Sequence, residues 1–497
     1  MIVDDDVRYR AVQSRDARFD GKFFTAVVTT GIYCRPICPA KTPHRENVRF
    51  FGCAAAAEEA GFRPCKRCRP ETAPGTPVWN GTESSVARGI RLINSGFLEE
   101  RSVEELSATL GMGARHLRRL FLRHLGAPPK ALDVQRRTHF AALLLSQTSL
   151  AIASVALDSG FRSIRQFNEA FRNSFGVSPT DVRRQRLDGT EFGRNDVTTE
   201  LKLSYRPPFD WKGLIGFFSA RAVRGIESVT EREYRRSFSV VTKKGVSAGV
   251  LSVTNSPERN CLIVKLAAPP VKLSSVVARI RAMFDLSADP QIIGEHLDAE
   301  GLLHGVSREI PGIRIPGVWD PFEAAIRAVV GQQITVRAAV GLLERIVRMC
   351  GTRFETGFDE SIGILFPTPQ ALYDADLDGL GMPGARKKTL KAIAAAWIDG
   401  SVPVKDYGSP EELTSALLSI PGVGPWTAEY IALRGFGEPD AFPSSDIALR
   451  AAVGRLLGRN EYASASEVAE IADAWRPWRG YAAQLLWRSL SRNREEG

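Results

Sequence analysis

The 497-residue sequence contains no apolar run long enough to cross a membrane, since none reaches eighteen residues. Its first residues, MIVDDD, are acidic and lack the apolar core of a secretory signal. Cysteine is sparse: there are seven, too few and too unevenly spaced for a disulfide framework in a reducing compartment. These absences predict a cytoplasmic protein that has no membrane partner.

The composition is that of an ordinary folded protein, with 44% hydrophobic and 25% charged residues, which excludes wholesale disorder. Lysine and arginine (66) outnumber aspartate and glutamate (56), so the formal net charge is +10. A basic chain of this size fits an anionic polymer as partner, although solubility alone would also explain the charge. At roughly 150 residues per domain, the length predicts about three domains.

Composition divides the chain into successive segments. Strand-like runs at 238–241 and 261–264 make the fourth segment mixed, whereas the second and last have helical patterns. The expected fold is multidomain and mainly α: a small α/β domain that carries five of the seven cysteines, an all-α double helix-turn-helix, and an α+β part with a helix-hairpin-helix. The predicted boundaries are 1–80, 84–186, a linker at 187–200, then 201–310 and 311–497.

Four cysteines in the first segment have the spacing of a metal site. Cys34 and Cys38 form a C-x3-C pair, and Cys65 and Cys68 form a C-x2-C pair. Two such pairs can surround one Zn²⁺ tetrahedrally, with each sulfur about 2.3 Å from the metal. Cys53 lies outside the pattern and is expected in the core. A purely structural zinc ion remains an alternative to a reactive one.

The segments TTGIYCRPICPAK, HRENVRFF and AGFRPCKRCRPE resemble the N-terminal domain of Ada-type methylphosphotriester repair proteins over nearly all of residues 1–71. The resemblance implies that Cys34 is both ligand and nucleophile and accepts a methyl group from a DNA phosphotriester. Four thiolates on Zn²⁺ carry a net charge near −2, and methylation of one lowers the repulsion of DNA. The resemblance also implies phosphate contacts for Thr30, Arg63 and Arg67, although these could equally be solvated surface residues.

The second segment carries two related helical units. Residues 102–126 and 152–184 each show a short helix, a glycine-containing turn and an arginine-bearing helix, joined by a helix around 131–145. The GF-S-R-F---F---G-SP pattern resembles the AraC/XylS DNA-binding domain. Six residues are expected in its core: Leu117, Leu120, Phe121, Phe161, Phe167 and Phe171.

In such units the second helix enters the DNA major groove. Arginine suits guanine and glutamine suits adenine, so the chemistry fits reading of bases, although a phosphate contact is equally open for any single residue. The candidates are Arg115, His116 and Arg119 in the first unit, and Arg162, Ser163, Arg165 and Gln166 in the second.

A helix-hairpin-helix pattern occupies residues 413–437, with the turn PGVG between two helical runs. Gly422 and Gly424 would let the backbone approach a DNA phosphate, and N–H groups at the next helix start would attract its charge. A simple tight turn is the alternative. Asp446 follows Gly424 by 22 residues, and a hairpin followed by Asp at this interval resembles the glycosylase signature of the helix-hairpin-helix superfamily.

A longer match includes DPFEAAIRAVVGQQIT, GLGMPGARKKTLKAIA and WRPWRGYAAQLLW, and resembles AlkA-type 3-methyladenine glycosylase II over about 201–491. It implies hydrolytic release of alkylated purines. Asp446 would stabilise the sugar cation and orient water, by the logic of glycoside hydrolysis. Because aromatic rings attract cations, the expected base pocket consists of Trp426, Tyr430, Trp487 and Phe217.

The damaged nucleotide has to leave the base stack, and Gln332 and Gln333 are the candidates for filling the gap. Relatives often have an aliphatic residue there, so Gln333 leaves the identity of the wedge open. Trp426 stands where glycosylase-lyases carry a lysine, and residues 406–497 contain no lysine. A Schiff base is therefore not expected, and the enzyme should be monofunctional.

Further absences narrow the function. No cysteine follows Cys350, so no four-cysteine iron–sulfur cluster is expected, nor any organic cofactor. Neither Cys261 nor Cys350 lies in a Pro-Cys-His-Arg motif, so repair of O6-methylguanine is not predicted. The expected partners are alkylated and promoter double-stranded DNA, with RNA polymerase as the target of an activator, and the chain is expected to be a nucleoid-associated monomer. The alternative is a transcriptional regulator whose glycosylase fold only binds DNA.

Overall fold

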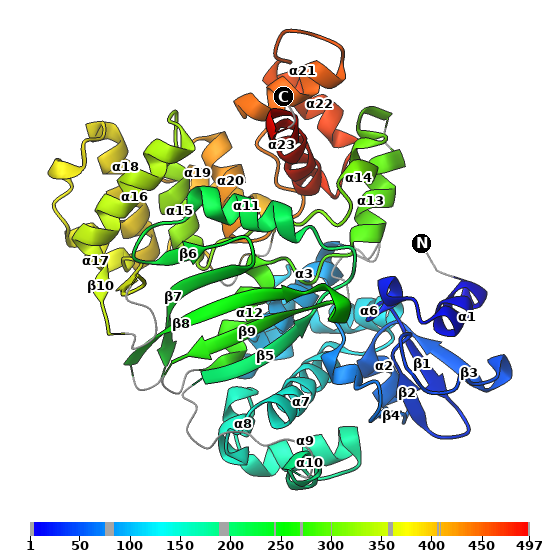
Figure 1. Ribbon diagram of the computed structural model, residues 1–497. Coiled ribbons are helices and arrows are strands. Elements are labelled where there is room, and N and C mark those ends of the chain that lie inside the picture. The colour runs from blue at the N-terminus through cyan, green and yellow to red at the C-terminus, as the bar shows by residue number, and fades with distance from the viewer. Residues whose placement is uncertain are drawn as a thin grey trace.

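The computed structural model describes residues 4–74, 84–187, 198–242, 245–268, 272–299, 301–355, 361–404, 407 and 409–495. A five-stranded sheet lies at the centre, the helical part of the C-terminal half lies above it, and the N-terminal modules lie below and beside it (Figure 1). Within these ranges no helix combines the length and apolarity needed to span a membrane.

The N-terminal module is built on a four-stranded sheet in the order β3-β1-β2-β4. β1 pairs antiparallel with β2 and β3, whereas β2 and β4 run parallel, with Tyr33 opposite Pro64. The parallel pair brings the ends of both strands, and hence the cysteines that follow, to one edge. Its elements are α1 (Asp5–Ser14), β1 (Phe24–Val27), β2 (Ile32–Cys34), β3 (Val48–Phe51), α2 (Ala54–Glu59), β4 (Arg63–Pro64) and 3-10 turns at Ala17–Phe19, Arg45–Asn47 and Pro70–Thr72.

The second module is all helical, as predicted. Ser102 forms a capping box with Glu105, Ser163 caps the second recognition helix, and Gly126 and Gly176 end the two recognition helices in the left-handed conformation. The six predicted core residues are all buried. The helices are α3 (Ser84–Asn94), α4 (Phe97–Glu100), α5 (Val103–Thr109), α6 (Ala114–Leu125), α7 (Pro129–Gln147), α8 (Ile152–Asp158), α9 (Ile164–Phe175) and α10 (Pro179–Leu187).

The third module begins with an antiparallel sheet in the order β5-β9-β8-β7-β6. Its first strand starts at Thr198, inside the segment predicted as a linker, and residues 188–197 of that segment lie outside the described residues. The elements are β5 (Thr198–Ser204), α11 (Trp211–Arg221), β6 (Glu227–Val229), β7 (Glu233–Thr242), β8 (Gly245–Ser256), β9 (Cys261–Ala267), α12 (Leu273–Met283), α13 (Pro290–Ala299), α14 (Val306–Glu309) and 3-10 turns at Pro257–Arg259 and Gly301–Leu303.

Helices follow to the end of the described chain, around one large apolar core. A buried ion pair of Arg236 with Glu323 (2.8 Å) joins the sheet to this helical part. The elements are α15 (Pro321–Val330), α16 (Val336–Cys350), β10 (Thr352–Arg353), β11 (Ile364–Leu365), α17 (Pro369–Asp374), a 3-10 turn at Asp378–Leu380, α18 (Gly384–Ile398), α19 (Pro410–Leu418), α20 (Pro425–Gly435), α21 (Ile447–Leu456), α22 (Ala465–Asp473) and α23 (Arg479–Glu495).

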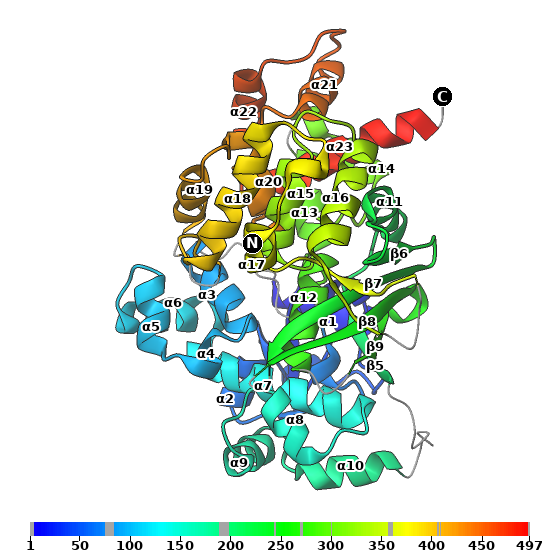
Figure 2. The ribbon, with the colours of Figure 1, turned by 90° about the vertical axis from the view of Figure 1, so that its left-hand side faces the viewer.

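The modules share packed interfaces. Residues 141–145 of α7 belong to the same apolar core as the five-stranded sheet, and Figure 1 shows α7 beneath β5. Cys53 is buried, as predicted, but in the core of the first helix-turn-helix unit. Figure 2 shows α3 below the helical glycosylase part, where Arg91 meets Glu438 at 2.8 Å. The tertiary structure therefore joins modules that the sequence suggested were tethered by linkers.

Candidate zinc centre, DNA-binding helices and excision pocket

The four predicted cysteines come together as a metal site. Their Sγ atoms all lie within 4.8 Å of one another, and sulfurs about 2.3 Å from a tetrahedral Zn²⁺ are about 3.8 Å apart. The thiol pattern thus fits one zinc ion. Hydrogen bonds within the cluster lower the pKa of the Cys65 thiol but raise that of Cys34, so a bound metal ion is what would make Cys34 a thiolate.

Exposure separates Cys34 from the other ligands. Cys38, Cys65 and Cys68 are buried, whereas Cys34, at the end of β2, is partly exposed. Partial exposure is compatible with a ligand that reacts, and it also occurs in structural zinc sites.

Arg35 is a feature of this centre that the spacing did not reveal. Its backbone N–H donates to Cys68 Sγ (3.4 Å), and its buried side chain donates to Asp20 Oδ1 (2.8 Å) and to Thr72 Oγ1 (2.7 Å). The guanidinium forms an ion pair with Asp20, so the direct contact to a cysteine sulfur comes from the Arg35 backbone N–H. The side chain also ties the zinc knuckles to the loop before β1.

The three predicted phosphate contacts lie in different surroundings. Thr30 and Arg67 are exposed, as a phosphate contact requires. Arg63 is exposed as well, but its Nη1 lies against the end of α9: a Cβ built on Gly176 would come within 2.9 Å of it. Arg63 therefore packs at the joint between the zinc module and the second helix-turn-helix unit.

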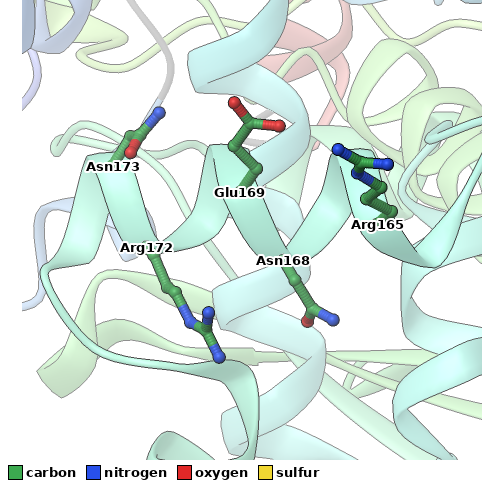
Figure 3. Close-up of a pocket in the computed structure, with 5 residues that line it drawn as sticks. All are labelled: Arg165, Asn168, Glu169, Arg172 and Asn173. Carbon is green, nitrogen blue, oxygen red and sulfur yellow. The ribbon is translucent and has the colours of Figure 1, made fainter.

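The second recognition helix carries a polar face. Arg165, Asn168, Glu169, Arg172 and Asn173, all from α9, line a shallow depression (Figure 3). Of the predicted contacts, Arg165 lies on this face, while Gln166 and Ser163 are exposed in the first turn and its cap.

The remaining candidates are also exposed. Arg115, His116 and Arg119 lie on the solvent face of α6, and Arg119 Nη2 is 3.0 Å from His116 Nδ1. Arg162 differs, because its guanidinium donates to the backbone carbonyl of Glu99 at 3.2 Å. This bond links the loop before α9 to the first unit, a structural role that the pattern did not indicate.

Asp446 is the N-cap of α21, and four N–H groups hold its carboxylate. Oδ1 accepts from the backbone N–H of Ala448 and Leu449 (both 3.0 Å) and from Trp487 Nε1 (3.0 Å), and Oδ2 accepts from Trp426 Nε1 (2.9 Å). These donors and the N-terminus of α21 all direct positive partial charge at the Asp446 oxygens. The side chain is half-buried, so the charge remains accessible.

The four predicted pocket aromatics gather beside this carboxylate from α11, α20 and α23. Trp426 stacks on Tyr430 with ring centroids 5.1 Å apart, and Tyr430 meets Trp487 edge-on at 6.5 Å. Phe217 joins them through Arg434, whose guanidinium carbon lies 4.7 Å from the Phe217 ring. All four rings are half-buried, so part of each is open to a ligand.

The hairpin turn lies directly before α20. Gly422 is exposed and has a φ of +87°, a conformation that a side chain would disfavour, and a Cβ there would lie 1.9 Å from Thr389 Oγ1. Gly424 caps α20 in an extended conformation. The turn thus exposes backbone at a helix start, where an anion is favoured.

The two glutamines after α15 have different surroundings. Gln332 Nε2 donates to Thr427 Oγ1 (2.9 Å), and the Gln332 carbonyl accepts from Arg386 (2.7 Å), so Gln332 connects the loop to the hairpin. Gln333 is exposed and has a φ of +56°, which is strained for a residue with a side chain. Of the two wedge candidates, Gln333 is thus the more exposed.

Family models match the chain in four places. They are the metal binding domain of Ada at residues 7–71, a helix-turn-helix domain at 106–185, the AlkA N-terminal domain at 200–320 and the HhH-GPD superfamily base excision DNA repair protein at 326–477. The molecule is thus of a composite class: a zinc-binding module, a helix-turn-helix module and a base-excision glycosylase fold in one chain.

Whole-chain similarity narrows this class. A probable bifunctional transcriptional activator/DNA repair enzyme AlkA of Mycobacterium tuberculosis is 41% identical over 97% of this chain and 96% of its own. The DNA-3-methyladenine glycosylase 2 of Escherichia coli is 35% identical over 57% of this chain and 95% of its own. The chain belongs to the family of bifunctional transcriptional activator/DNA repair enzymes AlkA.

The fold of the glycosylase part also has a solved counterpart. A 3-methyladenine DNA-glycosylase from Archaeoglobus fulgidus superposes with a TM-score of 0.50 at 22% identity, covering 57% of this chain and 96% of that one. At this identity the likeness establishes the fold alone.

Proposed function

We propose that this protein is a monofunctional DNA glycosylase for alkylated purines joined to a zinc-thiolate methyl acceptor and a promoter-binding helix-turn-helix module. The observation that carries the glycosylase function is the Asp446 carboxylate, held by four N–H donors at the edge of four half-open aromatic rings. A protein that only clamps DNA needs neither the carboxylate nor the rings. Trp426 and Tyr430 lie on α20, the helix that follows the hairpin turn, and Asp446 caps the next helix, α21.

The excision chemistry follows from this arrangement. The hairpin backbone at Gly422 and Gly424 holds a phosphate, Gln333 enters the gap, and the extruded purine lies among the aromatic rings. The C1′–N9 bond breaks, its electron pair leaves with the base, and Asp446 stabilises the electron-deficient sugar. Water adds to C1′ and loses a proton. The products are a free base and an abasic site.

Cys34 is the proposed methyl acceptor. A bound Zn²⁺ would keep its sulfur as a thiolate, and the partial exposure of Cys34 supports the approach of a neutral phosphotriester. The S–CH₃ bond forms as the O–CH₃ bond breaks, and the electron pair returns to the phosphate oxygen. The thioether lowers the negative charge of the centre, so DNA affinity rises and the exposed faces of α6 and α9 can hold a promoter.

The glycosylase function is tested by base release from dimethyl-sulfate-treated DNA, with wild-type protein and the Asp446→Asn variant side by side. Release of 3-methyladenine by the wild type alone would establish both the activity and its carboxylate. No release from either protein, with folding and DNA binding confirmed, would favour the regulator that only binds DNA.

Methyl transfer is tested by mass spectrometry of the protein after incubation with methylated DNA. The expected result is a single added CH₂ mass at Cys34, with none at Cys38, Cys65 or Cys68. An unmodified Cys34 in zinc-loaded protein would contradict the acceptor role and leave the zinc site structural.

A further inference from the structure

A buried positive charge lies behind the excision pocket. Arg434, on α20, is only 3% exposed, and its guanidinium carbon lies 4.7 Å from the ring centroid of Phe217, 5.0 Å from Trp487 and 5.6 Å from Tyr430. Three of the four pocket rings therefore pack around one cation. A pocket for a cationic purine would be expected to avoid such a charge.

Neutral groups, rather than a carboxylate, hold this charge. Arg434 donates to the carbonyl of Pro316 (3.1 Å) and to Gln484 Oε1 (2.8 Å), and forms no ion pair with any acid among the described residues. Buried Arg236, in contrast, pairs with Glu323 at 2.8 Å. An unpaired buried cation is costly. Burial lowers the pKa of Arg434 to about 10, which still leaves it protonated at neutral pH.

Trp487 connects this cation to the carboxylate. Its Nε1–H donates to Asp446 Oδ1 (3.0 Å), while its ring lies 5.0 Å from the Arg434 guanidinium carbon. A base among the rings thus has positive charge behind it and negative charge towards its sugar. The guanidinium carbon of Arg221 lies 4.0 Å from the centroid of the Phe217 ring, so a second cation adjoins the same group of rings.

We propose that Arg434 is a positioning residue that acts through the pocket rings to set how strongly excision depends on the charge of the purine. This inference rests on the proposed glycosylase function. When an alkylated, cationic purine leaves, the bond electrons neutralise the base and positive charge moves to the sugar. When a neutral purine leaves, the same electrons make the base anionic until it takes a proton.

The two substrate classes therefore respond differently to Arg434. The guanidinium repels the cationic alkylated base in the bound substrate, which raises KM. It does not repel the nearly neutral base that leaves in the transition state, so kcat for the alkylated substrate rises as well. For a neutral base it leaves binding unchanged and stabilises the anionic leaving group. Asp446 favours the sugar cation in both cases.

The test compares the steady-state kinetics of excision from two oligonucleotides, one with 7-methylguanine (cationic) and one with hypoxanthine (neutral). Arg434→Gln, which removes the charge but keeps a donor, is expected to lower kcat/KM for hypoxanthine about tenfold. For 7-methylguanine, KM and kcat should fall together and leave kcat/KM within about threefold. Arg434→Lys, which keeps the charge, should retain the wild-type ratio between the substrates.

Gln484→Leu is the matched control, because it removes an acceptor of Arg434 but leaves the charge in place. It should change both substrates by the same factor. Equal losses on both substrates in Arg434→Gln, or a wild type that releases no hypoxanthine, would overturn the inference while leaving the glycosylase intact. A wild type that releases no 7-methylguanine would overturn the proposed function itself.

Discussion

The two reactive centres of this molecule are assembled in opposite ways. The four zinc ligands lie between Cys34 and Cys68 on the edge of one small sheet. The excision pocket draws Phe217, Trp426 and Trp487 from three helices of the glycosylase. A site formed by a short stretch of chain can be recognised from the spacing of its ligands in the sequence. A site formed by distant helices can be recognised only from longer sequence patterns and from resemblance to a family.

The centres also stabilise negative charge differently. The thiolates need a metal ion and have the buried Arg35 beside them, whereas neutral N–H donors hold the Asp446 carboxylate. The proposed reactions match this difference. A methylated Cys34 is a stable thioether and acts once, while Asp446 stabilises charge without forming a lasting bond and can turn over.

The strongest test of this contrast disables each centre in turn and measures both activities. Asp446→Asn should lower base release by about 10³-fold, because it removes the charge that stabilises the sugar cation, while methyl acceptance stays at the wild-type level. Cys34→Ala should abolish methyl acceptance and methyl-dependent promoter binding and leave base release within about twofold. Both activities would be measured on one preparation of each variant, and parallel loss of the two in either variant would contradict independent chemistry.

Zinc removal should affect one centre only. A chelator at pH 7 should release one Zn²⁺ per chain and expose the four thiols to a thiol reagent, because metal binding contributes to the folding of this small module. Base release should persist, since the glycosylase pocket contains no zinc ligand. The amount of Zn²⁺ released per chain and the number of thiols that react would be measured, together with base release. Loss of excision in proportion to zinc would show that the modules depend on one another for folding.

Trp487→Phe would show how much a single donor contributes to the carboxylate. The ring remains but the N–H to Asp446 Oδ1 is lost, so kcat should fall about tenfold with little change in KM. Trp319→Phe is the control, because the buried indole N–H of Trp319 has no hydrogen-bond partner among the described residues. An equal effect of both substitutions would indicate general destabilisation.

The smallest expected effect concerns the joint between the modules. Arg91→Gln removes the ion pair of Glu438, which is 2% exposed and also accepts from the Tyr407 hydroxyl, and should lower the free energy of unfolding by about 2 kcal/mol. Arg459→Gln breaks an exposed pair with Glu467 and should cost less than about 1 kcal/mol. Urea unfolding followed by tryptophan fluorescence measures both. Equal effects would mean that α3 does not contribute to the stability of the glycosylase.

Features that depend on neighbouring residues were predictable from the sequence. The zinc-ligand set, the helices of both DNA-binding units and their buried cores were predictable because spacing and periodicity are local properties. The prediction of a linker at 187–200 was wrong at its C-terminal end, since Thr198 already pairs with Ala267 as the first residue of β5. A polar strand at a sheet edge has no pattern that separates it from a linker.

The sequence by itself determined the order of the modules, the cysteines that can hold zinc, the hairpin and the position of Asp446 after it. Only the tertiary structure decided that α7 packs against the glycosylase sheet, that Arg63 and Arg162 serve joints between elements, and that Arg434 lies behind the base pocket. The physical reason is that metal ligands and helix caps act over a few residues. The surroundings of a buried charge depend on helices that meet only when the chain is folded.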